Sequence, residues 1–161
     1  MNYFATLLSS AAHSLCLPGE SAGEIERYVR QHQGGSVTPE RAPFRRKLDF
    51  WAFAIVTATA KGLPPLDGPP SKWGGRKFVE TREVQMPNDL CEMLAVVAFA
   101  TLGVDHEGID DPKRIVELAN GLAGAGTPDV LKRLNDPDLR ITALAKTLEF
   151  AAEMRKALGS K

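Results

Sequence analysis

Basic residues gathered around a tryptophan are the feature of this sequence that most resembles a binding site. Lys72, Trp73, Arg76, Lys77 and Arg82 follow one another closely, with two glycines directly after the tryptophan. Glycines let a backbone approach a phosphate chain, cations neutralise the phosphates, and an indole ring can stack on a base or sugar. The alternative interpretation is that Trp73 closes one end of the core while the cations form a solvated surface.

Charge is unevenly distributed along a chain whose formal net charge is zero. From residue 41 to residue 82, nine Lys and Arg residues stand against three acids, and Arg45, Arg46 and Lys47 are consecutive. Such an asymmetry indicates a charged partner. We therefore predict a nucleic-acid-binding site in this part of the chain. Its residues are Arg45, Arg46, Lys72, Trp73, Arg76, Lys77 and Arg82.

The histidines and acids do not form a metal-binding motif. His13, His32 and His106 fall in different predicted elements, so the helical His spacings that bind metal are absent. An acidic patch from residue 105 to residue 111 offers the carboxylate oxygens that divalent cations prefer, but its spacing does not match a calcium loop. Asp110 and Asp111 also favour the positive end of a following helix. We expect neither a metal nor a cofactor, and a cation at the acidic patch is the open alternative.

Nucleophilic and nucleotide chemistry also lack a motif. The stretch from Gly68 to Lys77 contains no Gly-x-x-x-x-Gly-Lys register, and no serine has the Gly-x-Ser-x-Gly setting of a nucleophile. Cys16 and Cys91 are far apart and neither belongs to a Cys-x-x-Cys pair, so we expect two buried thiols. The sequence favours a non-enzymatic protein without catalytic residues.

A buried helix at 48–61 is the element around which the basic residues must be arranged. Between Phe50 and Ala60 only Thr57 and Thr59 interrupt the apolar residues, so no side of this segment can face water. A central strand is the alternative, because a short apolar run does not separate helix from strand by periodicity. Its alanines and the Gly62 that follows favour a helix, and the run is too short to cross a bilayer.

The other predicted elements follow from apolar spacing, capping residues and prolines. Helices are predicted at 2–15, 21–33, 90–102, 112–123, 128–134 and 137–158. Capping boxes begin at Ser21 and Asp89, and Asp111, Thr127 and Asp136 each precede a proline that can occupy the first helical position. Residues 62–75 are rich in proline and glycine and predict a long surface loop, while 77–85 predicts one short strand or hairpin arm.

These elements predict a single all-α domain over residues 1–161, with six or seven helices and with helices 48–61 and 90–102 packed at its centre. The chain has 161 residues, 43% of them apolar and 25% charged, which is typical of a soluble globular domain. No Lys or Arg precedes Arg27, whereas a secretory signal normally begins with positive charge. We expect a cytoplasmic protein that does not bind membranes.

The order of features over about residues 44–134 resembles the small accessory proteins encoded with prokaryotic DNA phosphorothioation (sulfur-modification) defence systems. The features are Phe44 before a charged run, an Ala/Phe-rich helix ending at Lys61 and Gly62, a basic loop, a second apolar helix, and the segments 117–121 and 129–131. The resemblance implies an accessory, DNA-linked and non-enzymatic role beside a larger protein partner from the same locus. It supplies no catalytic residues.

Two functions from different classes remain open at this point. In the first, the chain is an accessory protein that binds nucleic acid through its basic, Trp-containing loop. In the second, it is a protein–protein interaction adaptor or a self-associating helical subunit, and its basic loop meets an acidic partner. Both contacts involve charge and weaken with salt, so salt dependence separates the two only in part.

Overall fold

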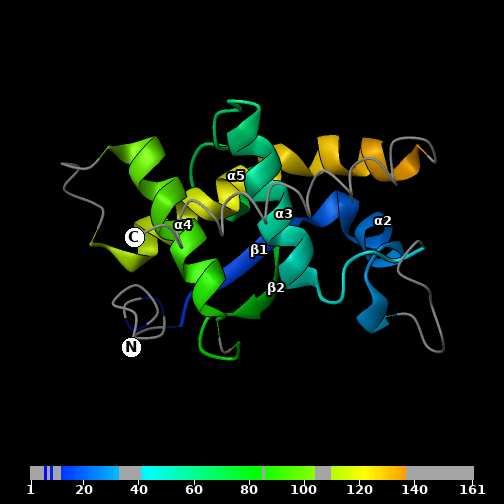
Figure 1. Cartoon of the computed structure of the whole chain (residues 1–161), viewed down its shortest axis with the longest axis horizontal. Helices are drawn as coiled ribbons and strands as arrows, with labels where there is room; N and C mark the ends of the chain where they lie inside the picture. The colour runs from blue at the N-terminus through cyan, green and yellow to red at the C-terminus, as the bar shows by residue number, and fades with distance from the viewer. Residues whose placement is uncertain are drawn as a thin grey trace, which may run out of the picture.

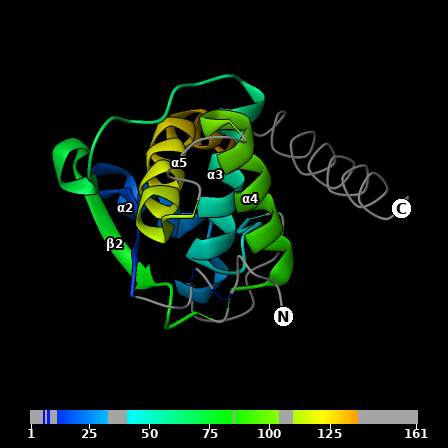
Figure 2. The same cartoon turned by 90° about the vertical axis from the view of Figure 1, so that its left-hand side faces the viewer.

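The computed structural model describes residues 6, 8, 12–32, 41–84, 86–103 and 110–136. The fold is mostly helical with one two-stranded antiparallel sheet. Its elements in chain order are β1 (Ser14–Pro18), η1 (Gly19–Ser21), α2 (Ala22–Arg27), η2 (Arg30–His32), α3 (Lys47–Ala60), η3 (Pro70–Trp73), β2 (Gly75–Glu80), α4 (Asn88–Leu102) and α5 (Pro112–Asn135), where η marks a 3-10 turn. Helix α5 runs through the molecule, and the sheet forms one flank of it (Figure 1 and Figure 2).

Helix α3 confirms the predicted central helix to within one residue. Phe50, Trp51 and Ile55 are completely buried, as expected for a helix that is apolar on nearly every side. Its start is fixed by Asp49, whose carboxylate accepts a hydrogen bond from the Arg46 backbone N–H (2.9 Å). The basic run before α3 is therefore held at a defined helix entrance.

Helix α5 shows that the prediction of two helices at 112–123 and 128–134 is wrong. Its start agrees with the sequence, because the Asp111 side chain accepts from the Lys113 N–H (3.0 Å). Pro128, however, lies inside the helix, and the Thr127 hydroxyl donates to the Ala123 carbonyl one turn back (2.7 Å) instead of capping a new helix. Burial of the residues around Pro128 offsets the backbone hydrogen bond that a proline removes.

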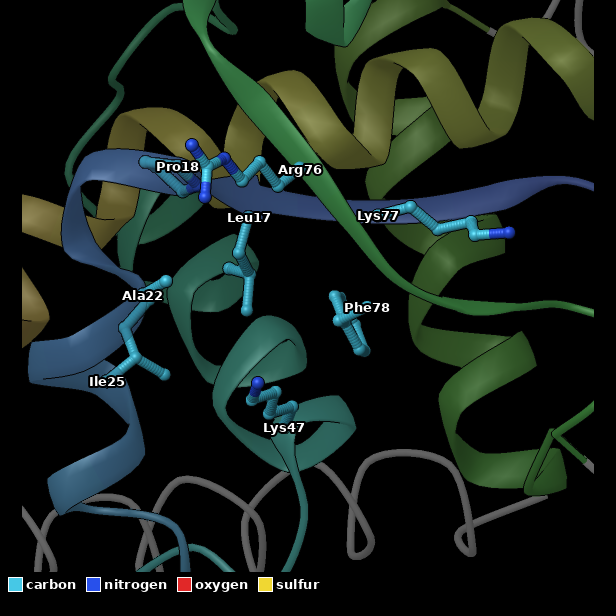
Figure 3. A pocket seen from close by; sticks show the side chains of 8 residues that line it. All are labelled: Leu17, Pro18, Ala22, Ile25, Lys47, Arg76, Lys77 and Phe78. Atoms are coloured by element: carbon cyan, nitrogen blue, oxygen red, sulfur yellow. The ribbon is translucent and has the colours of Figure 1, made fainter. Parts of the chain in front are cut away.

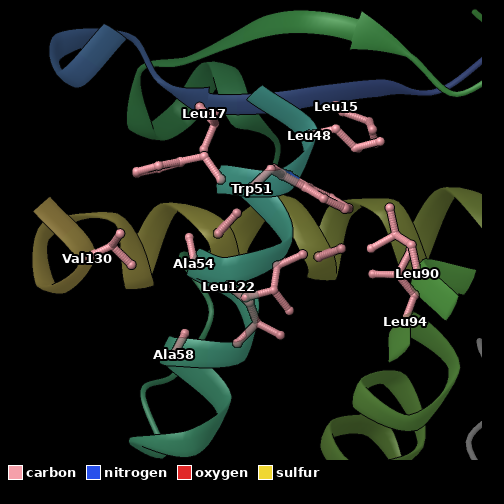
Figure 4. Packing of buried hydrophobic residues seen from close by; sticks show 14 of the residues in the cluster. Leu15, Leu17, Leu48, Trp51, Ala54, Ala58, Leu90, Leu94, Leu122 and Val130 are labelled. Atoms are coloured by element: carbon pink, nitrogen blue, oxygen red, sulfur yellow. The ribbon is translucent and has the colours of Figure 1, made fainter. Parts of the chain in front are cut away.

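The main partner of α3 is α5, which corrects the predicted central pair of helices 48–61 and 90–102. Small residues allow this approach, since a Cβ added at Gly126 would lie 2.0 Å from the Ala54 carbonyl oxygen of α3. Helix α4 packs on α5 as well, and its Leu90 and Leu94 join the same core (Figure 4). The apolar stripe of 90–102 identified a buried helix but not its neighbour, because apolar surface does not select a partner.

Strand β1 replaces the end of the helix predicted at 2–15; most of that range lies outside the described residues. Leu15, Cys16 and Leu17 are all buried, so this strand has no polar face and its apolar run can be mistaken for a helix. It pairs with β2, which confirms a strand close to the predicted 77–85. The partner strand was not expected.

A buried asparagine closes the edge of β1 that faces α5. The Asn120 amide oxygen accepts from the Cys16 backbone N–H (2.8 Å), and its amide nitrogen donates to the Ser14 carbonyl oxygen (2.9 Å). The Trp51 indole N–H of α3 donates to the same amide oxygen (3.1 Å). One side chain of α5 thus takes the place of a neighbouring strand and satisfies backbone groups that would otherwise be unpaired.

Several other predicted features differ from the structure. Helix α2 ends at Arg27, well before the predicted residue 33, and the Ser21 side chain makes no capping hydrogen bond. Helix α4 already begins at Asn88, ahead of the predicted Asp89 cap. The helix predicted at 137–158 lies outside the described residues. Within the described ranges the fold consists of helices α2 to α5 and a two-stranded sheet, so the prediction of six or seven helices is wrong. In these ranges, no helix combines the length and apolar character that crossing a bilayer requires.

Candidate binding groove

The seven predicted binding residues lie on three segments. Arg45 and Arg46 directly precede α3, Lys72 and Trp73 belong to η3, Arg76 and Lys77 to β2, and Arg82 to the turn after β2. The fold brings Arg46, Arg76 and Lys77 together around one groove. The other four, Arg45, Lys72, Trp73 and Arg82, are not among the described residues that line it.

The first hollow of this groove lies between the sheet, α2 and the start of α3, and has a volume of about 190 Å³. It is lined by Leu17, Pro18, Ala22, Ile25, Lys47, Arg76, Lys77 and Phe78. Figure 3 shows Leu17 and Phe78 pointing from the sheet toward α3 and Lys47 pointing back from α3. The Arg76 side chain lies across the strands toward Pro18, and the Lys77 side chain extends along the sheet away from the other labelled residues. An apolar floor therefore carries cations around its edge.

A second hollow of about 310 Å³ continues along the sheet. Lys47 and Phe78 line both hollows, so the two adjoin. The remaining lining residues are Gln31, Arg46, Leu48, Val79, Glu83 and Val84. We call the two hollows together the β2 groove. Its lining contains four cations and a single acid, Glu83.

A β-bulge interrupts β2 where this strand borders the groove. Leu15 pairs with Val79 and Cys16 pairs with Lys77, so Phe78 is an extra residue without a partner on β1. In a regular strand, successive side chains alternate between faces. A bulge breaks the alternation, and here three consecutive residues, Arg76, Lys77 and Phe78, all contribute to the lining of the first hollow.

Arg76 differs from the other cations of the groove in its electrostatic environment. Its side chain is exposed and passes directly over Gly19, where an added Cβ would lie 2.7 Å from the Arg76 Nε atom. Among the described residues no carboxylate forms an ion pair with it. Lys47 is paired with Glu26 of α2 (2.7 Å), and Arg46 with Asp49 (3.2 Å). Of the two guanidinium groups that line the groove, that of Arg76 is thus more available to an incoming anion than that of Arg46.

Lys77 shares the carboxylate of Glu80 with Arg82. The two ion pairs measure 3.0 and 3.1 Å, and the hydrogen bond from Lys77 lowers the pKa of Glu80 while the same bond raises the pKa of Lys77. The Lys77 and Arg82 side chains remain 52% and 67% exposed. Lys72 is likewise paired at the surface, with Asp67 (2.9 Å), whose pKa its hydrogen bond lowers. The positive stretch of the sequence is therefore largely neutralised in space.

Trp73 lies against helix α5, outside the groove. A Cβ added at Gly75 would lie 2.6 Å from the indole ring, and one added at Gly124 of α5 would lie 3.3 Å from it. The ring is half-buried, and its N–H is buried with no acceptor in the part of the chain that the structure describes. The Trp73 ring therefore packs beside α5 and does not line the β2 groove.

The apolar half of the groove and Lys47 are what the sequence-based prediction missed. Leu17, Ile25 and Phe78 come from three separate elements, and nothing in their local sequence distinguishes them from ordinary core residues. Lys47 was part of the recognised basic run, but only the fold shows that it lies between the two hollows. The signal that did point here was the pair Arg76 and Lys77 beside a β-forming segment.

The groove offers binding groups and no recognisable catalytic set. In the described ranges no three His, Cys, Asp or Glu residues lie close enough to hold a metal ion. Cys16 and Cys91 are free and buried, as predicted, and burial raises the pKa of both thiols. A high pKa keeps a thiol protonated and unreactive. No family model, curated protein or solved structure was found to match the chain.

Proposed function

We propose that this protein is a non-enzymatic interaction adaptor that holds an acidic protein segment in the β2 groove. The segment carries apolar side chains that fill the two hollows and carboxylates that meet Arg76, Lys77 and the Lys and Arg residues at the start of α3. This is the second of the two functions that the sequence left open, but the contact surface is now the β2 groove and no longer the Trp-containing loop.

One observation carries the proposal, namely that cations and an apolar floor occur in the same groove. Leu17, Ile25 and Phe78 line the first hollow together with three cations and no acid. A phosphate chain needs cations but gains little from an apolar floor. A peptide with alternating apolar and acidic side chains uses both, because burying apolar area supplies affinity while charge complementarity supplies selectivity and association rate.

The internal ion pairs do not prevent this binding. Lys77 and its partner Glu80 form a surface pair, and such exposed pairs contribute only about 0–1 kcal/mol. Lys77 can therefore exchange its partner for a ligand carboxylate at small cost. Arg76 needs no exchange, since no described carboxylate pairs with it.

Nucleic-acid binding is the second candidate, and one observation favours it. Lys72, Lys77 and Arg82 all keep more than half of their side-chain surface exposed although each is ion-paired. Phosphates can compete for such cations, and the resemblance to accessory proteins of DNA phosphorothioation systems would give this binding a biological setting. Against it, a phosphate chain would leave unused the apolar floor that Leu17, Ile25 and Phe78 form in the groove.

Fluorescence anisotropy separates the two candidates. The probes are a capped, labelled peptide as long as β2 that alternates valine with glutamate, the same peptide with lysine for glutamate, and labelled single- and double-stranded oligonucleotides. We expect saturable binding of the glutamate peptide, with a Kd below about 1 mM. Replacing Arg76 and Lys77 together by Ala should weaken it about tenfold or more, because hydrogen bonds to charged groups are lost.

The matched control replaces Lys113 and Arg114 by Ala, an exposed basic pair on the first turn of α5 that does not line the groove. This variant should bind the peptide as the wild type does. Equal loss in both double variants would mean that net charge, not the groove, determines binding. Tight oligonucleotide binding with a salt slope that Arg76→Ala/Lys77→Ala flattens by up to about 2 would favour the second candidate.

A further inference from the structure

We propose that the β2 groove holds the carboxyl-terminal end of its acidic partner, with the last, apolar side chain in the first hollow and the terminal carboxylate on the Arg76 guanidinium. This inference rests on the proposed function, since it describes which part of the partner enters the groove. It adds a requirement that the proposed function does not contain, namely a free chain end at one place in the groove.

Arg76 and part of the apolar floor lie at the same end of the groove. Arg76 lines the first hollow together with Leu17 and Ile25, and none of the three is among the described residues that line the second. Figure 3 shows the Arg76 side chain lying across the strands toward Pro18. Gly19 leaves room for this path, because a Cβ added there would lie 2.7 Å from the Arg76 Nε atom and 2.8 Å from its Cδ. An anion bound by Arg76 is therefore placed beside an apolar hollow.

The cations of the first hollow differ in their need for an anion. The described lining of this hollow contains three cations and no acid. Lys47 already pairs with Glu26 (2.7 Å), and Lys77 pairs with Glu80 (3.0 Å). In the part of the chain that the structure describes, no carboxylate pairs with Arg76. One available guanidinium beside an apolar hollow calls for one carboxylate beside an apolar side chain.

A chain end supplies this pair of groups in a single residue. In an extended segment successive side chains point to opposite faces, so a glutamate next to an apolar residue points away from the hollow that the apolar side chain enters. The last residue of a chain differs, because its side chain and its carboxylate are both attached to one α-carbon. A guanidinium also binds a carboxylate through two parallel hydrogen bonds, which orients the chain end. Recognition of a terminal carboxylate is a recurring mode of peptide binding.

The residues before the chain end run along the groove toward the second hollow. The two hollows adjoin at Lys47 and Phe78, so a segment that starts at Arg76 can continue past them. Figure 3 shows the Lys77 side chain extending along the sheet away from Arg76. Lys77 is thus placed to meet an acidic side chain further from the chain end, and Arg46 lines the second hollow beyond it. The acidic character of the partner is therefore used outside the contact with Arg76.

Fluorescence anisotropy with three versions of the valine–glutamate peptide tests the chain end. The first is capped by an amide after a final valine, and the second has a free carboxylate on that valine. The third carries two glycines after the valine and then a free carboxylate, so its net charge equals that of the second. We expect the second to bind about tenfold or more tighter than the first, because it gains charge-assisted hydrogen bonds. The third should bind as the first does, since its carboxylate is separated from the apolar side chain.

Arg76→Gln identifies the residue that binds the carboxylate. The variant keeps a long polar side chain without the positive charge, so the capped and free-acid peptides should bind it with equal affinity. Lys113→Gln is the matched control, because it removes one positive charge from an exposed residue that does not line the groove. In this control the difference between the two peptides should remain about tenfold.

The outcomes separate this inference from the proposed function. Equal binding of the capped and free-acid peptides to the wild type would overturn the chain-end contact while leaving the adaptor function in place. The same gain for the glycine-extended peptide would also overturn it, since added charge at any position would then suffice. A tenfold difference that persists in Arg76→Gln would remove Arg76 from the contact. Failure of all three peptides to bind at about 1 mM would overturn both proposals.

Discussion

Replacing Asn120 by Ala is the perturbation that tests the architecture around the groove most sharply. Asn120 is 2% exposed and makes three hydrogen bonds, to Cys16, Ser14 and the indole of Trp51. It joins the strand that carries Leu17 to both central helices. Its loss therefore affects the position of β1, and through β1 the position of β2 and the groove.

The expected cost follows from the groups left without partners. The Cys16 N–H and the Trp51 indole N–H make buried hydrogen bonds, and each orphaned buried donor costs about 1–3 kcal/mol. The bond to the Ser14 carbonyl is only partly buried, so water can replace the amide there and this group adds little. The two buried donors give about 2–6 kcal/mol, and we expect a loss near 4 kcal/mol.

Urea unfolding of the wild type and Asn120→Ala, followed by circular dichroism and by tryptophan fluorescence, measures this cost. Asn88→Ala is the matched control, because Asn88 is exposed at the start of α4 and should change stability by less than about 0.5 kcal/mol. A loss for Asn120→Ala below about 1 kcal/mol would refute the reasoning. It would mean that the asparagine does not hold the edge of β1.

The remaining predictions concern packing and charge. Gly126→Ala should destabilise the protein by about 1–3 kcal/mol or more in urea unfolding, because the added Cβ would collide with the backbone of α3. The control Gly23→Ala should stabilise it by about 0.5–1 kcal/mol, because an added Cβ there meets nothing within 4 Å. The reverse order of stabilities would contradict the close approach of α3 and α5. Trp73→Ala should lower stability by about 1–3 kcal/mol, and an unchanged midpoint would show that the ring does not close the core. Because Lys77 lowers the folded pKa of Glu80, this pair contributes stability that is present above the ordinary pKa and lost as pH falls through the lowered one. NMR titration of Glu80 should give a carboxyl pKa below 4.5 that rises in Lys77→Met, and an unchanged value would remove the ion pair from the account.

The helical part of the fold was predictable where local pattern decides the structure. Helix α3 is apolar on nearly every side and α4 is apolar along a stripe, so both segments must be buried, and the pattern identified them to within about two residues. Asp111 before Pro112 identified the start of α5 for the same reason. Each of these signals is complete within a few residues of chain.

Tertiary contacts decided what the sequence could not. Pro128 remains inside α5 because packing of the surrounding residues outweighs its local preference, and Leu15 to Leu17 form a strand because β2 and Asn120 satisfy the backbone on either side. The choice of α5 as the partner of α3 depends on Gly126 and Ala54, which are far apart in sequence. None of these contacts has a local signature.

The candidate site likewise has one part that the sequence predicts and one part that depends on tertiary contacts. The basic residues were visible in the sequence as an excess of charge, but their ion pairs with Glu26, Asp67 and Glu80 depend on the fold and remove much of that excess. The apolar floor of the groove is assembled from β1, α2 and β2, so its residues could not be grouped in advance. A charge run identifies a face of the molecule, and the fold determines which of its cations remain available.

A charge-swap titration tests the central claim most directly, namely that the β2 groove selects its partner by positive charge over an apolar floor. The wild type and Arg76→Glu/Lys77→Glu are each titrated with the valine–glutamate and the valine–lysine peptide. The wild type should prefer the glutamate peptide and the reversed variant the lysine peptide, each by about tenfold or more, because like charges repel and opposite charges attract at the same rim. The same preference in both proteins, or no preference in either, would contradict the claim.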